Sequence, residues 1–242
     1  MKLYVVGFGA GNFEGMTLQA KAVLEKCEVI VGYTVYVDLL KEYFPNKIFL
    51  TTPMKQEVER VRLAFEQAQS GKLTAIICSG DSGVYGMSGL ALQIGVEYPD
   101  VEVEIISGVT ACLSGGAVLG SPLTHDFAVI SLSDLMTPLQ KIHKRIAYAS
   151  MSDFVIVLYN PSSKKRKDYL RQACDIMLKY KSPETVCGYV RNISRGGEES
   201  HILTLAELRN TQVDMFTTVF IGNSETKVIN GKMVTPRGYK DV

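Results

Sequence analysis

Hydrophobic and polar positions repeat with two different periods along the first half of the chain. Short continuous apolar runs predict buried strands, whereas apolar residues spaced three and four apart predict amphipathic helices. A parallel sheet covered on both faces produces such an alternation. The predicted strands are Leu3–Phe8, Val29–Gly32, Thr74–Cys78 and Val103–Ile106, and the predicted helices are Thr17–Glu25, Gln56–Ser70 and Leu90–Tyr98.

The second half repeats the alternation, but its last strands follow one another closely. Strands without long crossovers between them favour antiparallel pairing, so we expect a mixed sheet here. The predicted strands are Phe127–Ser131, Phe154–Tyr159, Thr185–Arg191, His201–Thr204 and Thr217–Ile221, and the predicted helices are Pro138–Met151, Tyr169–Lys179 and Leu205–Arg209.

A stretch rich in glycine and other small residues, Gly115–Pro122, separates the two halves and is the best candidate boundary. The 242 residues suit one large domain or two modest ones. We therefore predict an α/β protein of two domains, residues 1–118 with a mainly parallel sheet and residues 119–242 with a mixed sheet.

Charge and hydropathy narrow the classes of partner. The 26 Lys and Arg residues nearly balance the 25 Asp and Glu residues, for a net charge of +1, whereas a dedicated nucleic-acid binder usually has a strong basic excess. No apolar run reaches the roughly 18 residues of a membrane span. The amino terminus enters a glycine-rich turn without a signal-peptide layout. We expect a cytoplasmic protein with no nucleic-acid or membrane partner.

The five cysteines give no sign of a disulfide framework or a metal site. Their number is odd, their spacing is wide, and no Cys-x-x-Cys motif occurs. The three histidines are equally scattered. We therefore expect reduced thiols that pack as small hydrophobic side chains, and no protein-bound metal.

Three loops rich in glycine or small residues follow predicted strands of the first half. Residues 7–12 read GFGAGN, so the third glycine of a dinucleotide-binding G-x-G-x-x-G motif would fall at Asn12, and no P-loop Lys follows. Residues 79–87 read SGDSGVYGM, and residues 107–111 read SGVTA. Ligands bind α/β folds at such strand ends, so Asp81 is suited equally to contact a ligand and to cap a helix.

Motifs along the whole chain carry a resemblance to a known family. GFGAGN at 7–12, CSGDSGVYGM at 78–87, SGVTA at 107–111 and GSPL at 120–123 resemble the tetrapyrrole methylases, the class III S-adenosylmethionine-dependent methyltransferases. HDF at 125–127, ISLSDL at 130–135, LYNPSSK at 158–164, IGNS at 221–224 and TPRGY at 235–239 are similar to one branch of that family. That branch methylates C17 of precorrin-3B or cobalt-factor III, with ring contraction, in cobalamin biosynthesis.

The resemblance implies a homodimeric enzyme of the tetrapyrrole methylase fold, with the active site in the interdomain cleft and a substrate trough in the first domain. S-adenosylmethionine is then the methyl donor and S-adenosylhomocysteine the product. Most relatives have Pro where Ala10 and Ser82 stand, and because Pro fixes φ at about −65°, we expect a more adaptable first loop. The implied donor contacts are Gly9, Ala10, Ser79, Gly80, Asp81, Val84, Thr110, Ala111, Tyr159, Asn160, Arg191 and Asn192.

The implied reaction needs alignment of two carbon centres and proton transfers during ring contraction. His125 is the natural general acid or base, because imidazole titrates near neutral pH, although a histidine at a strand start can also be merely structural. Asp126 can orient the imidazole, and Ser131 is a third catalytic candidate. Ser133 and Asp134 are expected to hydrogen-bond the substrate, although Asp134 could equally cap the following helix.

The implied substrate is a polycarboxylate, so cationic side chains are expected around it. Residues 164–167 (KKRK) form the dense basic run of the sequence. Arginine suits bidentate contact with carboxylates. The candidate substrate-binding residues are Ser133, Asp134, Lys164, Arg166, Arg195 and Arg237, with Arg191 as a further cation.

Three other functions remain open at the level of the sequence. The chain could methylate a different carbon of a corrin precursor, bind or modify nucleic acid through the basic run, or bind a corrin without catalysis. The YNPSSK and TPRGY segments favour C17 over another carbon. The balanced charge and the lack of interleaved aromatic residues oppose nucleic acid, and Asp81 with its glycine-rich loops opposes an inactive protein.

Overall fold

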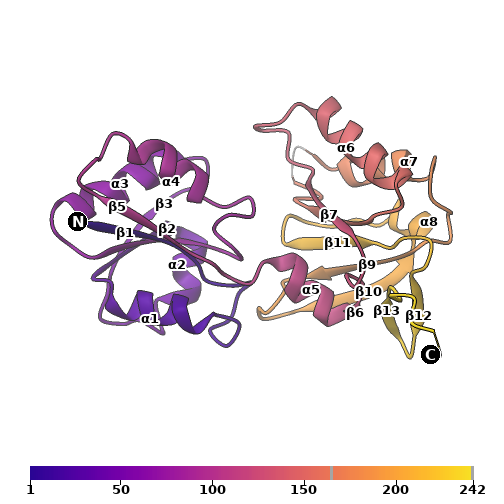
Figure 1. Ribbon diagram of the computed structural model, residues 1–242, viewed down its shortest axis with the longest axis horizontal. Coiled ribbons are helices and arrows are strands. Elements are labelled where there is room, and N and C mark those ends of the chain that lie inside the picture. Colours follow the sequence, from indigo (N-terminus) through magenta and orange to yellow (C-terminus); the bar gives the residue numbers. More distant parts are fainter. Residues whose placement is uncertain (164–165, 241–242) are drawn as a thin grey trace. The chain divides into compact units, whose positions relative to one another are not determined.

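The computed structural model describes residues 1–163 and 166–240 of the chain. The chain forms two compact units, Met1–Thr110 (unit 1) and Ala111–Val242 (unit 2). The predicted boundary at residues 118 and 119 coincides with the carboxyl end of a helix of unit 2, α5 (Ala111–Leu119). Unit 1 has a parallel sheet and unit 2 a mixed sheet, which confirms the predicted fold class (Figure 1).

Unit 1 is a five-stranded parallel sheet with strand order β3-β2-β4-β1-β5. Helices α3 and α4 cover one face and α1 and α2 cover the other (Figure 1). The strands are β1 (Lys2–Gly7), β2 (Val29–Tyr33), β3 (Ile48–Thr52), β4 (Thr74–Cys78) and β5 (Glu102–Ile106), and the helices are α1 (Leu18–Lys26), α2 (Thr34–Leu40), α3 (Glu57–Gln69) and α4 (Ser88–Gly95).

The pleat of the central strands explains their continuous apolar sequences. Successive side chains point to opposite faces, and both faces are covered by helices. Val5 packs in the core that contains Phe65 of α3, whereas Val6 packs in the core that contains Leu24 of α1. All four side chains are fully buried.

Unit 2 contains a five-stranded sheet with strand order β10-β9-β11-β8-β7 and a small three-stranded sheet, β12-β13-β6. β7 is parallel to β8, and β11 is antiparallel to both β8 and β9, so β7, β8 and β9 run in one direction. The strands are β6 (Gly120–Ser121), β7 (Phe127–Ser131), β8 (Val155–Tyr159), β9 (Val186–Arg191), β10 (Glu199–Thr204), β11 (Thr217–Ile221), β12 (Lys227–Ile229) and β13 (Lys232–Val234), and the helices besides α5 are α6 (Leu139–Met151), α7 (Tyr169–Met177) and α8 (Leu205–Leu208).

The glycine-rich stretch Gly115–Pro122 forms the last part of α5 up to Leu119 and then the short strand β6. Helix α5 packs closely on the large sheet of unit 2: a Cβ on Gly115 would lie 2.9 Å from Ile193 and 3.0 Å from Phe220. Small residues are therefore needed at this helix surface. A cluster of small residues is also typical of a linker, which is why the sequence pattern predicted a boundary here. The structure also contains elements that the sequence pattern did not predict, namely α2, β3, β6, β12 and β13.

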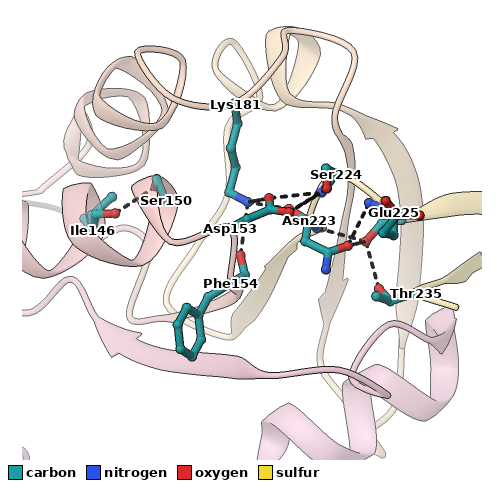
Figure 2. Close-up of polar contacts among 11 residues, drawn as sticks. Ile146, Ser150, Asp153, Phe154, Lys181, Asn223, Ser224, Glu225 and Thr235 are labelled. Carbon is teal, nitrogen blue, oxygen red and sulfur yellow. Dashed lines mark hydrogen bonds and ion pairs between the residues drawn. The ribbon is translucent and has the colours of Figure 1, made fainter. Parts of the chain in front are cut away.

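A buried lysine joins two strands of unit 2 at the edge where β8 begins and β11 ends (Figure 2). Lys181 is 3% exposed and donates to a carboxylate oxygen of Asp153 at 3.2 Å and to the carbonyls of Phe154 and Gly222 at 3.0 Å. Asp153 in turn accepts hydrogen bonds from the amide and hydroxyl of Ser224. We call these residues the Lys181 network.

Within the described ranges, no helix combines the length and the apolar character that crossing a membrane requires.

Candidate functional site

The three sequence loops of unit 1 lie together at the carboxyl edge of its sheet. Gly9 and Gly80 bridge the loops after β1 and β4 through paired backbone hydrogen bonds, with N–O distances of 3.1 and 2.7 Å. β1 and β4 are neighbours in the sheet, and the chain leaves them in opposite directions: it goes from β1 to β2 on one side and from β4 to β5 on the other. Ligands bind open α/β sheets at this point.

The carboxylate of Asp81 fastens two of these loops to each other. Its Oδ1 accepts a hydrogen bond from the amide of Gly83 at 2.8 Å, and its Oδ2 accepts one from the amide of Gly108 at 2.9 Å. The helix-capping alternative for Asp81 is wrong, since α4 begins at Ser88 with Met87 at its N-cap position. Asp81 therefore holds the loops at the carboxyl edge of the sheet together through backbone amides. We call these loops the ligand edge of unit 1, after the position at which open α/β sheets bind ligands.

The backbones of the loops after β1, β4 and β5 lie in close contact, and only glycine, which has no Cβ, allows this contact. A Cβ on Gly108 would lie 2.2 Å from the carbonyl oxygen of Gly80 and 2.5 Å from that of Gly7. Gly9 adopts a φ of 88°. The ligand edge of unit 1 thus brings together seven of the predicted donor contacts, Gly9, Ala10, Ser79, Gly80, Asp81, Val84 and Thr110.

In unit 2, polar side chains gather at the carboxyl edge of the three strands that run in one direction. β7, β8 and β9 end at Ser131, Tyr159 and Arg191. The residues that follow Tyr159 and Arg191 are Asn160 and Asn192, with φ values of 53° and 51°. Asparagine tolerates this left-handed conformation better than most residues, so both turn the chain sharply at the strand ends.

The hydroxyl of Ser131 is held by two donors and is the centre of a polar cluster. It accepts hydrogen bonds from Asn160 Nδ2 at 3.0 Å and from the amide of Ser133 at 3.2 Å. Arg166 Nη1 donates to Ser133 Oγ at 2.7 Å, and its Nε lies 3.7 Å from Asp134 Oδ1. We call these residues, together with Tyr169, the Ser131 cluster.

Tyr169 is a member of this cluster that sequence reasoning missed. Its hydroxyl donates to Asp134 Oδ2 at 2.8 Å. The hydrogen bond to Asp134 raises the pKa of Tyr169, burial adds to the rise, and Arg166 opposes it. The sequence places Tyr169 at the start of an amphipathic helix, where a core role is the ordinary interpretation. Its spacing of three residues from Arg166 was the available signal.

The remaining predicted contacts of this edge have different surroundings. Tyr159 accepts a hydrogen bond from the amide of Cys112 at 2.6 Å, so its hydroxyl binds the first turn of α5. Arg191 Nε lies 2.9 Å from Asp214 Oδ2, which neutralises its charge within the unit. The guanidinium of Arg195 lies over the ring of Phe216 at 6.0 Å. Ala111 is the first residue of α5.

His125 and Asp126 do not belong to the Ser131 cluster. They precede β7, whereas Ser131 ends it, and a strand of five residues separates its ends by roughly 15 Å. The imidazole of His125 is 49% exposed and lies 3.9 Å from Asp126. Arg237 is exposed in the segment after β13. Lys164 lies outside the described residues.

Comparisons with known proteins identify the family of the chain. The family described as Tetrapyrrole (Corrin/Porphyrin) Methylases matches residues 2–209. The chain is 44% identical to the probable cobalt-factor III C(17)-methyltransferase of Salmonella typhimurium, over 98% of this chain and 99% of that protein. It is 45% identical to the cobalamin biosynthesis protein CbiHC of Archaeoglobus fulgidus, over 99% of this chain and 53% of that one.

Among solved structures, the methyltransferase CobJ superposes with a TM-score of 0.88 at 29% identity, over 97% of this chain and 99% of that chain. The chain spans about half the length of the first two curated relatives and nearly the full length of the Salmonella protein. The family match covers most of the chain, and its fold, glycine-rich loops and relatives agree. The chain belongs to the tetrapyrrole methylase family.

Proposed function

We propose that this protein is an S-adenosylmethionine-dependent methyltransferase of cobalamin biosynthesis, which methylates C17 of cobalt-factor III, or of metal-free precorrin-3B, with ring contraction. The observation that carries the proposal is the nearly full-length identity to the Salmonella protein of that name. The bridged loops of unit 1 support the proposal, because they lie at the edge of a parallel sheet where α/β proteins commonly bind ligands. We further propose that the protein is cytoplasmic and forms a homodimer. Sedimentation of the purified protein would test the homodimer, and a monomer mass would contradict it.

The ligand edge of unit 1 fits a methyl donor. No side chain stands on Gly9, Gly80 or Gly83, so a ligand can approach the backbone of these loops closely. The amides of all three residues already bond within the loops, which holds the backbone in place for that approach. The bound donor supplies an activated methyl group, and alignment then provides much of the rate. In this proposal Asp81 holds the loops in the binding conformation, because both of its carboxylate oxygens bond loop amides.

The Ser131 cluster is the part of unit 2 that we propose to act on the substrate. Its hydroxyls, amide and guanidinium are fixed by one another, which gives each a defined direction. The charge of Arg166 is opposed by Asp134, so the pair can hydrogen-bond a substrate without adding net charge. Ser131 and Asn160 offer polar atoms for proton movement or oxygen contacts during ring contraction.

Methyl transfer in vitro tests this function. We expect purified protein to move labelled methyl from S-adenosylmethionine to cobalt-factor III or precorrin-3B, and ¹³C label should appear at C17 by NMR. Omitting the protein and omitting the tetrapyrrole are the controls. Label in neither tetrapyrrole would overturn the proposal, and label at another carbon would assign the chain to a different methylation step.

A further inference from the structure

Unit 1 contains a buried arginine at the same edge as its glycine-rich loops. Arg60 of α3 is 4% exposed. Its Nη2 donates to the carbonyls of Thr52 at 3.4 Å and Pro53 at 2.9 Å, and its Nη1 contacts the sulfur of Met87 at 3.4 Å. The guanidinium carbon lies 5.8 Å from the ring centre of Tyr33. Arg60 therefore touches the carboxyl ends of β2 and β3 and the loop after β4.

The positive charge of Arg60 lacks a close negative partner. None of the ion pairs found in the described ranges includes it. Burial lowers the pKa of Arg60, and Glu57 opposes that effect only at a distance. A buried charge is costly unless it is paired, so neutral carbonyls and a thioether are weak compensation for a guanidinium.

Two polar atoms at this place have no hydrogen-bond partner. Among the described residues, the buried side-chain atoms in this condition are Arg60 Nε and Thr52 Oγ1. Thr52 is 5% exposed, and Arg60 already donates a hydrogen bond to its backbone carbonyl. Buried polar atoms without partners are rare and call for a ligand, an ion or a water.

We propose that Arg60 and Thr52 bind one carboxylate group of the substrate. The proposal rests on the proposed function, which makes the substrate a polycarboxylate tetrapyrrole. The Nε–H of Arg60 and the hydroxyl of Thr52 are donors, and a carboxylate offers two acceptor oxygens. The negative charge would also compensate the guanidinium. Arg60 thereby becomes a specificity-determining residue at the ligand edge of unit 1.

The segment that covers the guanidinium is short and exposed. Residues 53–55 follow β3, and all three are exposed. Lys55 adopts a φ of 71°, which is unfavourable for a residue with a side chain. Carbonyl contacts from Thr52 and Pro53 hold this segment against Arg60, so a small displacement of the segment opens the path for a carboxylate.

Equilibrium binding of cobalt-factor III, followed by its visible absorbance, tests the proposal without requiring turnover. We expect Arg60→Met to weaken this binding about tenfold to a hundredfold and Thr52→Val about fivefold. Arg60→Lys keeps the charge and should recover part of the affinity. The affinity for S-adenosylhomocysteine should stay unchanged in every variant.

The chain offers matched controls. Arg62 lies on the same helix but forms a two-pronged, exposed ion pair with Glu97, at 2.6 and 2.8 Å. Thr51 precedes Thr52 in β3 and is exposed. Arg62→Met and Thr51→Val should leave both affinities unchanged.

The outcomes separate the alternatives. If Arg60→Met and Thr52→Val lower the melting temperature but leave the tetrapyrrole affinity unchanged, the proposal is overturned. A buried water between the two side chains would then be the explanation for their missing partners. If Arg60→Met does not fold, Thr52→Val and Arg60→Lys decide the question. Wild-type protein that binds the tetrapyrrole through Arg60 but transfers no methyl group would contradict the proposed function and not this site.

Discussion

The carboxyl edges of the two sheets, where we propose that ligands bind, are built from different parts of the polypeptide. In unit 1 the contacts end on backbone groups: the backbones of Gly9 and Gly80 bond each other, and the carboxylate of Asp81 accepts a hydrogen bond from the amide of Gly108. In unit 2 the contacts run between side chains, from Asn160 to Ser131 and through the rest of the Ser131 cluster. Both edges stand at the carboxyl ends of strands that run in one direction.

This difference determines how each edge responds to an amino-acid substitution. Backbones in contact leave no space for a Cβ, so a substitution in unit 1 must move a loop. A network of side chains loses one hydrogen bond at a time, each worth about 1 kcal/mol. We therefore expect loss of binding where a tightly packed glycine of unit 1 gains a Cβ, and graded effects where a substitution removes a hydrogen bond in either unit.

The largest effect is expected from Gly108→Ala. The added Cβ would overlap the carbonyl oxygens of Gly80 and Gly7, so the loops after β1, β4 and β5 must separate. We expect S-adenosylhomocysteine binding to be lost in calorimetry and the free energy of unfolding to fall by about 3 kcal/mol. Gly89→Ala is the matched control, because its Cβ meets nothing within 4 Å in α4, and it should stabilise slightly. Equal donor affinity in both variants would refute the backbone model of unit 1.

A smaller effect is expected from Asp81→Asn. Asparagine keeps one acceptor oxygen and loses the other, so one of the two loop amides, of Gly83 or Gly108, loses its partner. Donor affinity should fall about tenfold, since one charge-assisted hydrogen bond is worth about 1.5–3 kcal/mol and the loops can partly adjust. Asp100→Asn, at an exposed position, is the control. If donor affinity stays the same, Asp81 does not organise the loops.

The ligand edge of unit 1 was predictable because its signal is local. Glycines and Asp81 follow apolar strands directly, and parallel strands end at one edge of a sheet. Arg60 gave no such signal, because an arginine inside an amphipathic helix is usually exposed and only the packing of α3 buries it.

In unit 2 the sequence indicated Ser131, Ser133 and Asp134 but separated Tyr169 from them by more than thirty residues, and tertiary folding brings it to Asp134. The sequence placed the boundary in Gly115–Pro122, and the structure begins unit 2 at Ala111, because close helix packing and flexible turns both select glycine. The sequence grouped His125 with Ser131 although β7 separates them.

The comparison of Ser131→Ala with His125→Ala sharpens the assignment within unit 2. Ser131 is oriented by Asn160 and by the Ser133 amide, whereas His125 lies at the other end of β7. We expect Ser131→Ala to lower kcat about tenfold with unchanged donor affinity, and His125→Ala to lower it less than twofold. Steady-state kinetics with cobalt-factor III measure kcat for both variants. A larger loss in His125→Ala would move the chemistry away from the Ser131 cluster.

The smallest effect on activity is expected from Asp153→Asn, which alters unit 2 away from its ligand edge. Burial tends to raise the pKa of Asp153, but hydrogen bonds from Ser224 and the ammonium of Lys181 outweigh it, so the pKa in the folded protein lies below the ordinary 3.8. Stability from this group is then present above pH about 4 and is lost as the pH falls through the lowered pKa. Asp153→Asn should destabilise by about 1–2 kcal/mol at pH 7 and leave kcat unchanged. Urea unfolding across pH 2–7 should show the difference between wild type and variant vanish at the acid end, and a constant difference would exclude ionised Asp153 as its source.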